Sequence, residues 1–222
     1  MPTRPHVFIN CAMSADGKIS TVDRRQLRIS GDDDRERVDR LRAESDAIMV
    51  GVGTVLADDP GLRVRSEILR RQRSEMGKPE SPLRVVADSL ARTPPWAKVL
   101  GDGCLIAISQ EAPQERLGML PPGCEILRCG RKRVDLTDLL SALHERGIRR
   151  LMVEGGGSLN WSLFRAGLVD EIYTFVGGLI LGGSSAPSPV DGEGFREGFP
   201  RLRLVSAERM DDGVLLRWRV HH

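Results

Sequence analysis

Short apolar runs alternate with amphipathic segments along most of the chain. Each apolar run has about the length of a β-strand and is bounded by glycine, proline or polar residues, which is typical of a buried strand. Several runs are almost continuous in Val, Ile and Leu, as in strands that are covered on both faces. The pattern predicts strands over residues 6–12, 47–50, 83–87, 104–108, 125–127, 150–154, 171–177, 204–208 and 214–220.

Helical periodicity is found between these runs. In residues 32–43, Val38 and Leu41 recur at helical spacing among charged residues, and the aspartates at the start suit the positive end of a helix dipole. Residues 135–145 and 159–166 are also predicted helices, and each is followed by a glycine that can end a helix. Residues 66–82 are charged and have few core positions, so we expect a surface excursion there.

The order of these elements indicates the fold class. Strands alternate with helices through the middle of the chain, whereas its last part is rich in strands. This order predicts an α/β fold with a mostly parallel central sheet, flanking helices and antiparallel strands at the C-terminal edge. The 222 residues show no repeat and no linker, so we expect a single domain over residues 1–222.

The composition argues against several classes of protein. Lys and Arg total 33 against 31 Asp and Glu, and this balance gives no electrostatic case for nucleic acid. No apolar run approaches a membrane span or a signal peptide, so we expect a cytoplasmic protein that does not bind membranes. The four cysteines form no CxxC pair and have no histidine near them, so we expect neither a metal site nor a disulfide framework.

Two predicted strands run into glycine-rich loops. AIMV (47–50) is followed by GVGT, and LMVE (151–154) is followed by GGGS. In open α/β sheets ligands bind at the carboxyl ends of strands, where glycine lets the backbone approach a ligand and the first turn of a helix favours an anion. Neither loop matches GxGxxG or a P-loop, so each one alone fits a tight turn as well as a phosphate site. Two such loops together favour a nucleotide site.

Acidic residues accompany both loops. Glu154 ends a buried run, so it fits either a strand tip in solvent or a ligand contact. Asp58 and Asp59 precede Pro60, so this pair fits either a turn or an acceptor for ligand hydroxyls. No Ser/His/Asp set and no Cys/His pair stands out, so nucleophilic catalysis finds no support.

Five motifs, in order along the chain, resemble one enzyme family. They are INCAMSADGKIS (9–20), LRAESDAIMVGVGTVLADDPGLRV (41–64), VVADS (85–89), LMVEGGGSLNWSLFRAGLVDE (151–171) and LILGGSSAPSPVDGEG (179–194). The combination resembles the riboflavin-pathway reductases that act on a ribosylaminopyrimidine 5′-phosphate, and is most similar to their stand-alone archaeal and fungal branch. The resemblance covers nearly the whole chain. It implies a dihydrofolate-reductase-like fold and, as is common in the family, a homodimer.

The resemblance implies NADPH as the hydride donor. The glycines after Glu154 would hold its pyrophosphate, while Arg92 and the arginines around Arg131 are candidates for its 2′-phosphate by position. The residues that the resemblance assigns to this cofactor are Thr54, Asp58, Asp88, Ser89, Leu90, Gly130, Gly155, Gly156, Gly157 and Ser158.

The same resemblance implies a substrate site with a phosphate-binding part. Arg42 and Arg65 carry guanidinium groups that suit a phosphate, with an exposed helix charge as the alternative for Arg42. Asn10 can both donate and accept, which suits a pyrimidine that keeps its exocyclic amine. The implied substrate contacts are Asn10, Arg42, Leu62, Arg65 and Glu154. Glu154 and Lys18 are the candidate catalytic residues, with a bound water as the alternative proton donor.

Two departures from the bacterial relatives affect the implied activity. Arg28 stands near a position where those relatives often carry tryptophan, and the chain has no H-x-E or P-C-x-x-C motif of a zinc deaminase. We therefore expect reduction of 2,5-diamino-6-ribosylamino-4(3H)-pyrimidinone 5′-phosphate without deamination. The alternatives are a reductase acting on the deaminated pyrimidine as in bacteria, another reductase of the same fold such as dihydrofolate reductase, and a non-catalytic nucleotide-binding module.

Overall fold

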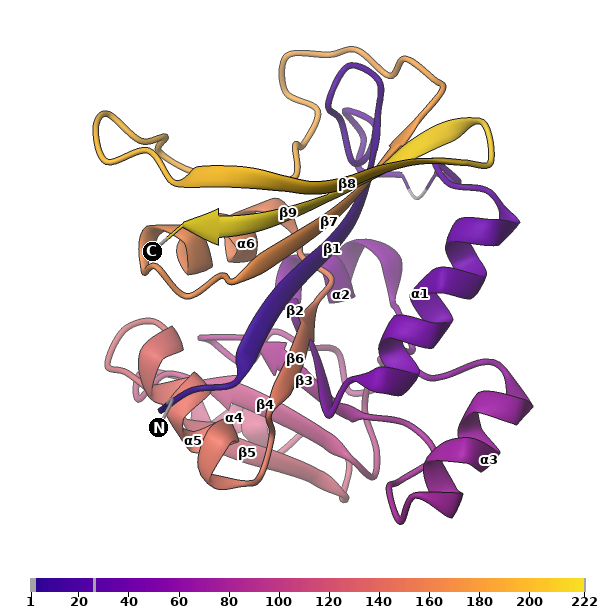
Figure 1. Cartoon of the computed structure of the whole chain (residues 1–222). Coiled ribbons are helices and arrows are strands. Elements are labelled where there is room, and N and C mark those ends of the chain that lie inside the picture. The colour runs from indigo at the N-terminus through magenta and orange to yellow at the C-terminus, as the bar shows by residue number, and fades with distance from the viewer. Residues whose placement is uncertain (1–2, 26, 222) are drawn as a thin grey trace. The chain divides into compact units, whose positions relative to one another are not determined.

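The computed structural model describes residues 3–25 and 27–221 (Figure 1). Residues 1, 2, 26 and 222 of the expected domain lie outside the described residues. The chain divides into two compact units: unit 1 is residues 1–6 and 39–152, and unit 2 is residues 7–38 and 153–222. The division passes through helix α1 (Asp32–Glu44) and strand β6 (Arg150–Val153). Whether the chain is one domain stays a prediction.

Unit 1 is built on parallel strands. The strand order is β5-β4-β3-β2-β6, and the pairs β2–β3, β3–β4 and β4–β5 are all parallel. The new strands are β2 (Ala47–Gly51), β3 (Leu83–Ala87), β4 (Cys104–Ile108) and β5 (Cys124–Arg128). All residues of β4 are buried, as its continuous apolar sequence predicts.

Four further helices belong to unit 1. They are α2 (Val52–Asp58), α3 (Glu67–Glu75), α4 (Gln114–Leu117) and α5 (Leu136–Glu145). Helix α5 confirms its prediction: the side chain of Asp135 accepts hydrogen bonds from the amides of Thr137 and Asp138, and the apolar face of the helix is buried. Helix α2 directly follows β2, so the GVGT segment is part of a strand-to-helix connection.

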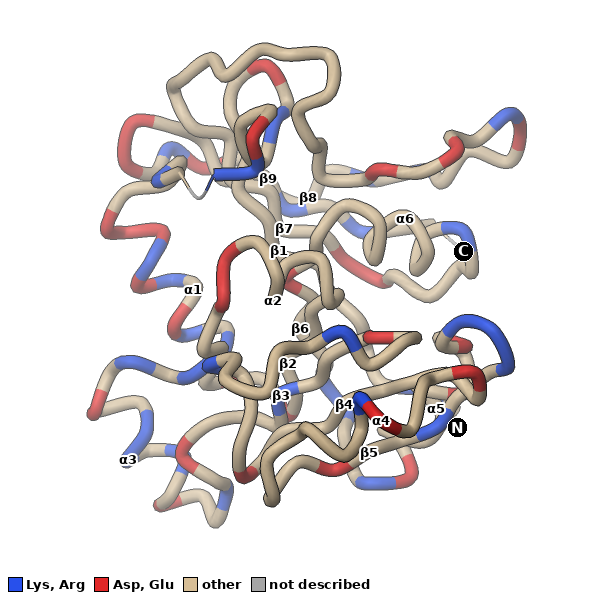
Figure 2. The backbone as a smooth tube through the Cα atoms, turned by 180° about the vertical axis from the view of Figure 1, so that it is seen from behind, with Lys and Arg blue, Asp and Glu red and all other residues tan. Residues whose placement is uncertain are grey.

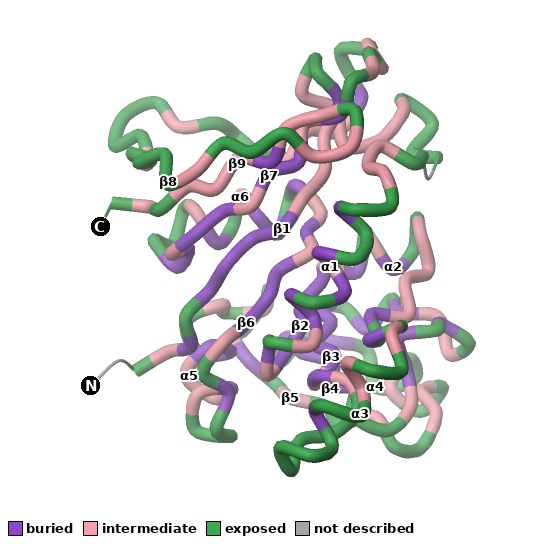
Figure 3. The backbone as a smooth tube through the Cα atoms, turned by 45° about the vertical axis from the view of Figure 1, so that its right-hand side comes forward, coloured by how far each residue is buried: buried purple, intermediate pink, exposed green. Residues whose placement is uncertain are grey.

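Unit 2 contains the antiparallel edge. Its strand order is β1-β7-β9-β8, with β1–β7 parallel and both β7–β9 and β8–β9 antiparallel. These strands are β1 (His6–Ser14), β7 (Glu171–Gly177), β8 (Arg201–Met210) and β9 (Gly213–His221), and the helix is α6 (Gly157–Arg165). Most residues of β8 are exposed (Figure 3), as befits the last strand in the order. The predicted α/β class with parallel strands and an antiparallel C-terminal edge is confirmed.

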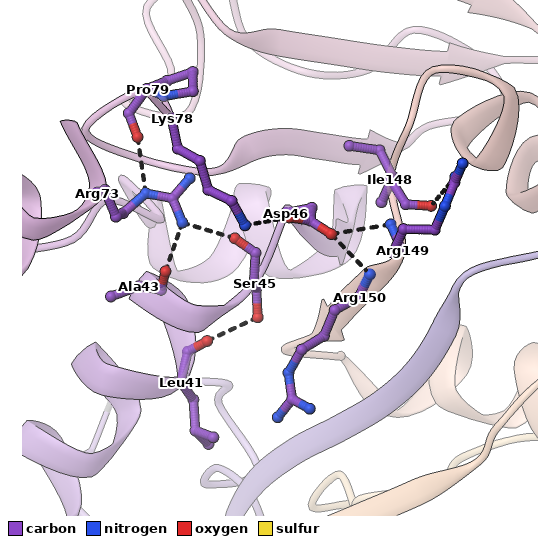
Figure 4. A network of polar contacts seen from close by, with 10 residues as sticks. All are labelled: Leu41, Ala43, Ser45, Asp46, Arg73, Lys78, Pro79, Ile148, Arg149 and Arg150. Atoms are coloured by element: carbon purple, nitrogen blue, oxygen red, sulfur yellow. Dashed lines mark hydrogen bonds and ion pairs between the residues drawn. The ribbon is translucent and has the colours of Figure 1, made fainter. Parts of the chain in front are cut away.

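The charged segment 66–82 is more ordered than the sequence predicts. It contains helix α3, whose start is capped by Ser66, and the side chain of Arg73 is buried with only 2% of its surface exposed. The Arg73 guanidinium donates to the carbonyl oxygens of Pro79, Ala43 and Ser45 at 2.8, 2.6 and 2.9 Å (Figure 4). The sequence predicted few core positions in this segment but did not identify Arg73 as one of them, because a guanidinium can be buried when carbonyls satisfy it.

Charged residues of both signs are interspersed through each unit (Figure 2). Within residues 3–25 and 27–221, no helix combines the length and apolar character needed to cross a membrane. The same residues contain no group of three or more His, Cys, Asp or Glu side chains that could hold a metal ion. All four cysteines are free thiols.

Candidate functional site

The carboxyl ends of the parallel strands of unit 1 lie in register. Gly51 of β2 pairs with Ala87 of β3, Ala87 with Ala107 of β4, and Ile108 of β4 with Arg128 of β5. The segments that follow these strand ends contain Thr54 and Asp58, then Asp88 to Leu90, then Gly130. The structure therefore brings six of the predicted cofactor residues to one edge of this sheet, where open α/β sheets bind ligands.

Hydrogen bonds join the segments after β3, β4 and β5. The carbonyl oxygen of Ser89 accepts from both the amide and the hydroxyl of Ser109, and the Ser89 hydroxyl oxygen accepts from the amide of Val134 at 3.0 Å. Gly130 has a φ of +77°, and a Cβ there would lie 2.3 Å from the carbonyl oxygen of Arg133. Gly130 is thus required by its own turn, whether or not a ligand lies against it.

Asp88 is fully buried and only partly satisfied. Its Oδ2 accepts from the amide and the hydroxyl of Thr93 at 2.7 and 2.8 Å, which closes the turn after β3. Its Oδ1 is buried and has no hydrogen-bond partner among the described residues. A buried acceptor without a donor is costly, so this oxygen suits a hydroxyl or amino group that is supplied from outside the protein.

The two aspartates before Pro60 have different environments. Asp59 is the C-cap of α2 with a φ of +43°, and its Oδ1 accepts from the amide of Lys98 at 2.8 Å. Asp58 is half-buried, and burial raises the pKa of its carboxyl group. The turn explanation therefore holds for Asp59, whereas Asp58 remains available for a ligand.

The predicted phosphate contacts lie on α1 and on the segment after α2. Arg42 is buried, so the alternative of an exposed helix charge is wrong, and its guanidinium donates to the carbonyl oxygen of Arg63 at 3.2 Å. Asp39, which the sequence did not suggest, accepts from the amides of Arg65 and Ser66 at 2.8 and 2.7 Å. The exposed Arg65 is thereby held on a segment anchored to the same helix.

Leu62 is placed differently from the other predicted substrate contacts. Its side chain is buried in unit 1, with 2% of its surface exposed, and its φ is +50°. Positive φ is unusual for a bulky residue. The buried side chain anchors the loop, so any contact with a ligand would come from its backbone.

In unit 2, the glycine loop between β6 and α6 has two kinds of glycine. Gly155 has a φ of +85°, and a Cβ there would meet nothing closer than 3.6 Å. A Cβ on Gly157 would lie 2.5 Å from the carbonyl oxygen of Ser188 and 2.8 Å from Oδ2 of Asp191. Gly156 is the N-cap of α6, and no side chain caps that end of the helix. The first-turn amides of Gly157 and Ser158 are therefore left to bind an anion.

Asn160 and the 188–191 loop support this glycine loop. Asn160 is 1% exposed, its Nδ2 donates to the carbonyl oxygen of Pro189 at 2.8 Å, and its Oδ1 is buried without a partner among the described residues. Asp191 accepts from the amide and hydroxyl of Ser188, and its own amide donates to Gly157. Asn160 occupies the position of the third glycine of GxGxxG, and this was the only signal for it in the sequence.

Lys18 lies at the end of a tightly bonded turn. The Asp16 carboxylate accepts from the Ser14 hydroxyl and from the amides of Leu181 and Gly182, and these bonds lower the pKa of Asp16 to about 2. The Lys18 ammonium group donates to the carbonyl oxygen of Ala186 at 3.1 Å. Lys18 is thus half-buried and held at a fixed place in unit 2. Glu154, the other candidate catalytic residue, is also half-buried and directly follows β6.

Asn10 belongs to a buried polar chain that the sequence did not reveal. The Arg37 guanidinium donates to Oδ1 of Asn10 and to Oδ1 of Asp34, both at 2.7 Å, and lies 5.9 Å from the centre of the Tyr173 ring. Because arginine is only a donor, it fixes the orientation of the amide: the Asn10 oxygen faces Arg37 and the amino group points elsewhere. Asn10 is therefore presented mainly as a donor.

The registered parallel strands of unit 1, with polar and glycine-bearing loops at their carboxyl ends, are typical of α/β proteins that bind ligands at this edge of the sheet. The particular family is shown by comparison: the model of the RibD C-terminal domain matches residues 5–216, and the chain belongs to this family.

Two relatives match the chain over nearly its whole length. It is 50% identical over 218 residues to the 2,5-diamino-6-ribosylamino-4(3H)-pyrimidinone 5′-phosphate reductase of Archaeoglobus fulgidus, covering 97% of this chain and 98% of the relative. It is 47% identical over 203 residues to the protein of the same name from Methanothermobacter thermautotrophicus, covering 90% of each.

A solved structure supports the fold. RibD of Acinetobacter baumannii, form 1, is similar with a TM-score of 0.81 and 26% identity. The match covers 99% of this chain but only 59% of the Acinetobacter chain.

Proposed function

We propose that the chain is an NADPH-dependent reductase that converts the ribosyl side chain of 2,5-diamino-6-ribosylamino-4(3H)-pyrimidinone 5′-phosphate to the ribityl chain, in riboflavin biosynthesis. Two relatives that carry this substrate in their names match almost all of the chain at 50% and 47% identity. The structural observation that carries the proposal is the row of predicted cofactor residues at the registered carboxyl ends of β2, β3 and β5.

Each unit has groups that suit a part of a dinucleotide. Within unit 1, Asp88 has a buried acceptor without a partner among the described residues, which suits a ribose hydroxyl or an adenine amine. Within unit 2, the first-turn amides of α6 suit a phosphate group. Asn160 offers a second buried acceptor without a partner among the described residues. When bound, NADPH supplies the hydride that reduces C1′ of the sugar.

The substrate contacts have distinct tasks. Arg42 and Arg65 provide two guanidinium groups for the 5′-phosphate, and Asp39 holds the segment that carries Arg65. The amino group of Asn10 donates to a carbonyl or ring-nitrogen acceptor of the pyrimidine, because its oxygen is engaged by Arg37. The deaminated pyrimidine keeps such acceptors, so activity on that compound is the alternative outcome of the assay.

Lys18 and Glu154 are the proposed catalytic residues. The Lys18 ammonium is held by the carbonyl of Ala186 and keeps two further donors for a developing negative charge or for proton transfer. The Glu154 carboxylate is an acceptor at the end of β6, suited to orient a ribosyl hydroxyl.

We also propose a cytoplasmic homodimer. Strand β8 ends the strand order and exposes Leu202, Leu204 and Val205, at 41%, 48% and 41% of their surfaces. An exposed apolar edge strand commonly pairs with another chain. Light scattering of the wild type and of Leu204→Lys tests the proposal: a wild-type monomer contradicts it.

The activity is tested by following NADPH absorbance with the aminated and the deaminated pyrimidine side by side. We expect consumption with the aminated substrate, and Glu154→Gln should lower turnover by roughly 10²–10⁴-fold while leaving NADPH affinity nearly unchanged. Single-turnover hydride transfer and a thermal melt on the same preparation separate lost chemistry from lost folding. NADPH binding without consumption of either substrate would instead support a non-catalytic nucleotide-binding module.

A further inference from the structure

A small pocket lies directly after the predicted cofactor segment of β3. Its volume is about 280 Å³, which is just below the ~300–1,000 Å³ of pockets that hold a whole drug-sized ligand. Pro94, Pro95 and Met119 form apolar parts of its wall, and Arg92 and Arg116 provide positive charge. The pocket is therefore sized for one end of a dinucleotide and has a wall that suits a flat base beside an anion.

The two arginines give the pocket a marked preference for anions. None of the seven residues that line it is acidic. Both arginines are exposed, and Arg92 has no hydrogen bond or ion pair to any residue in the described part of the chain. The NH1 group of Arg116 donates to the carbonyl oxygen of Leu90 at 3.1 Å, which leaves its other donors for a ligand. Arginine guanidinium groups such as these two are common protein partners of a phosphate monoester.

The position of the pocket is fixed by the predicted cofactor residues themselves. Asp88 holds Thr93, a lining residue, through two hydrogen bonds, and Ala91 between them has a φ of +50°. Arg116 is tied to Leu90, as described above. The pocket wall is thus continuous with the segment that is expected to contact the dinucleotide, within unit 1.

We propose that this pocket binds the adenosine end of the dinucleotide, with Arg92 and Arg116 holding its 2′-phosphate and thereby selecting NADPH over NADH. The inference rests on the proposed function and narrows its 2′-phosphate contact to one of the two positions that the sequence left open, Arg92 rather than the basic cluster around Arg131. A 2′-phosphate is a dianion with three acceptor oxygens, so two guanidinium groups match it in charge and in donors.

The decisive experiment is calorimetric titration with adenosine 2′,5′-bisphosphate and adenosine 5′-monophosphate, which needs no activity. The proteins are the wild type, Arg92→Gln, Arg116→Gln and Arg131→Gln. Arg71→Gln, on α3 and 74% exposed, is the matched control for loss of one surface charge. NADPH and NADH are titrated into the same set, and thermal melts verify folding.

We expect Arg92→Gln and Arg116→Gln each to weaken binding of the bisphosphate roughly 10- to 100-fold, because each removes charged hydrogen bonds to the phosphate. The affinities of both variants for the monophosphate and for NADH should change little. The affinity of Arg71→Gln for every ligand should also change little. If Arg131→Gln alone weakens the bisphosphate, or if the Arg92 and Arg116 variants weaken NADPH and NADH equally, the pocket assignment is wrong although the reductase stands. A wild type that binds neither NADPH nor NADH overturns the proposed cofactor, and the pocket assignment with it.

Discussion

Replacing one glycine in each of the two glycine-bearing loops separates the glycines that the fold needs from those that a ligand needs. Gly157, in the first turn of α6, packs against the 188–191 loop, whereas Gly53, in α2, has no atom within 4 Å of the place where its Cβ would lie. Gly157→Ala and Gly53→Ala add the same methyl group to helices at comparable positions. The two substitutions should nevertheless change the stability of the protein in opposite directions.

The expected cost at Gly157 follows from its neighbours. Ordinary contacts begin at about 3.4 Å, and the added Cβ would lie 2.5 Å from the Ser188 carbonyl oxygen, so that oxygen must move by about 0.9 Å. The movement strains two bonds: Asp191 amide to Gly157 carbonyl, at 3.1 Å, and Asn160 Nδ2 to Pro189 carbonyl, at 2.8 Å. Overpacking of about 1–3 kcal/mol and about 1 kcal/mol for each of the two affected bonds give a loss of about 3–5 kcal/mol.

The expected effect at Gly53 is opposite. Alanine is favoured over glycine inside a helix by about 1 kcal/mol, and nothing opposes the added methyl group. The melting temperature should therefore fall by roughly 6–20 °C in Gly157→Ala and rise by a few degrees in Gly53→Ala. In NADPH titrations, Gly53→Ala should weaken binding if the cofactor lies against α2, because the methyl group then meets the ligand and not the protein.

Equal melting temperatures for Gly157→Ala and the wild type would refute the reasoning about the 188–191 loop. Ser188→Ala is a useful companion, because it keeps the backbone oxygen that causes the overlap and removes only the hydroxyl bonded to Asp191. The overlap predicts that Gly157→Ala remains unstable in that background.

Three further predictions test the environments of single residues. Arg73→Met should lower the free energy of unfolding by about 3–5 kcal/mol in denaturant melts, because it removes three charged hydrogen bonds made by a buried side chain, whereas Arg71→Met should stay within about 0.5 kcal/mol. Burial raises the pKa of Asp58 above its unfolded value, so the favourable contribution of this residue is present below that value and is lost as pH rises through the folded pKa. Asp58→Asn should therefore raise the melting temperature at pH 7 and have no effect below about pH 4. Asn10→Asp keeps an acceptor for Arg37 but removes the donor, so KM for the pyrimidine should rise roughly 10-fold or more with the melting temperature maintained.

The sequence predicted the fold where hydrophobic periodicity was strong. Strands such as β4 are continuous apolar runs, and helix α5 has both a capping aspartate and a regular apolar face, so local signals and burial agree. In helix α3 local signals and burial do not agree, because its residues are mostly polar and its one fully buried side chain is a guanidinium. The carbonyls that satisfy Arg73 come from residues up to 30 positions away, and no local window contains them.

The candidate site divides in the same way. The strand ends, the glycine loops and the acidic pair at Asp58 are local features, and the sequence located them. Asp39 and Arg37 have no local signature, and Asn160 has only its place in the glycine loop, because each owes its role to partners 26 to 29 residues away along the chain. A motif marks where a ligand approaches the backbone, whereas the groups that hold the motif in shape are chosen by the fold. The glycines show why the distinction matters. Gly157 has no room for a Cβ beside Ser188 and Asp191, whereas Gly155 has that room but a φ of +85°, which favours glycine. Residue type alone therefore overstates how much of a loop serves the ligand, because the backbone conformation and the space around each Cα can require glycine without any ligand.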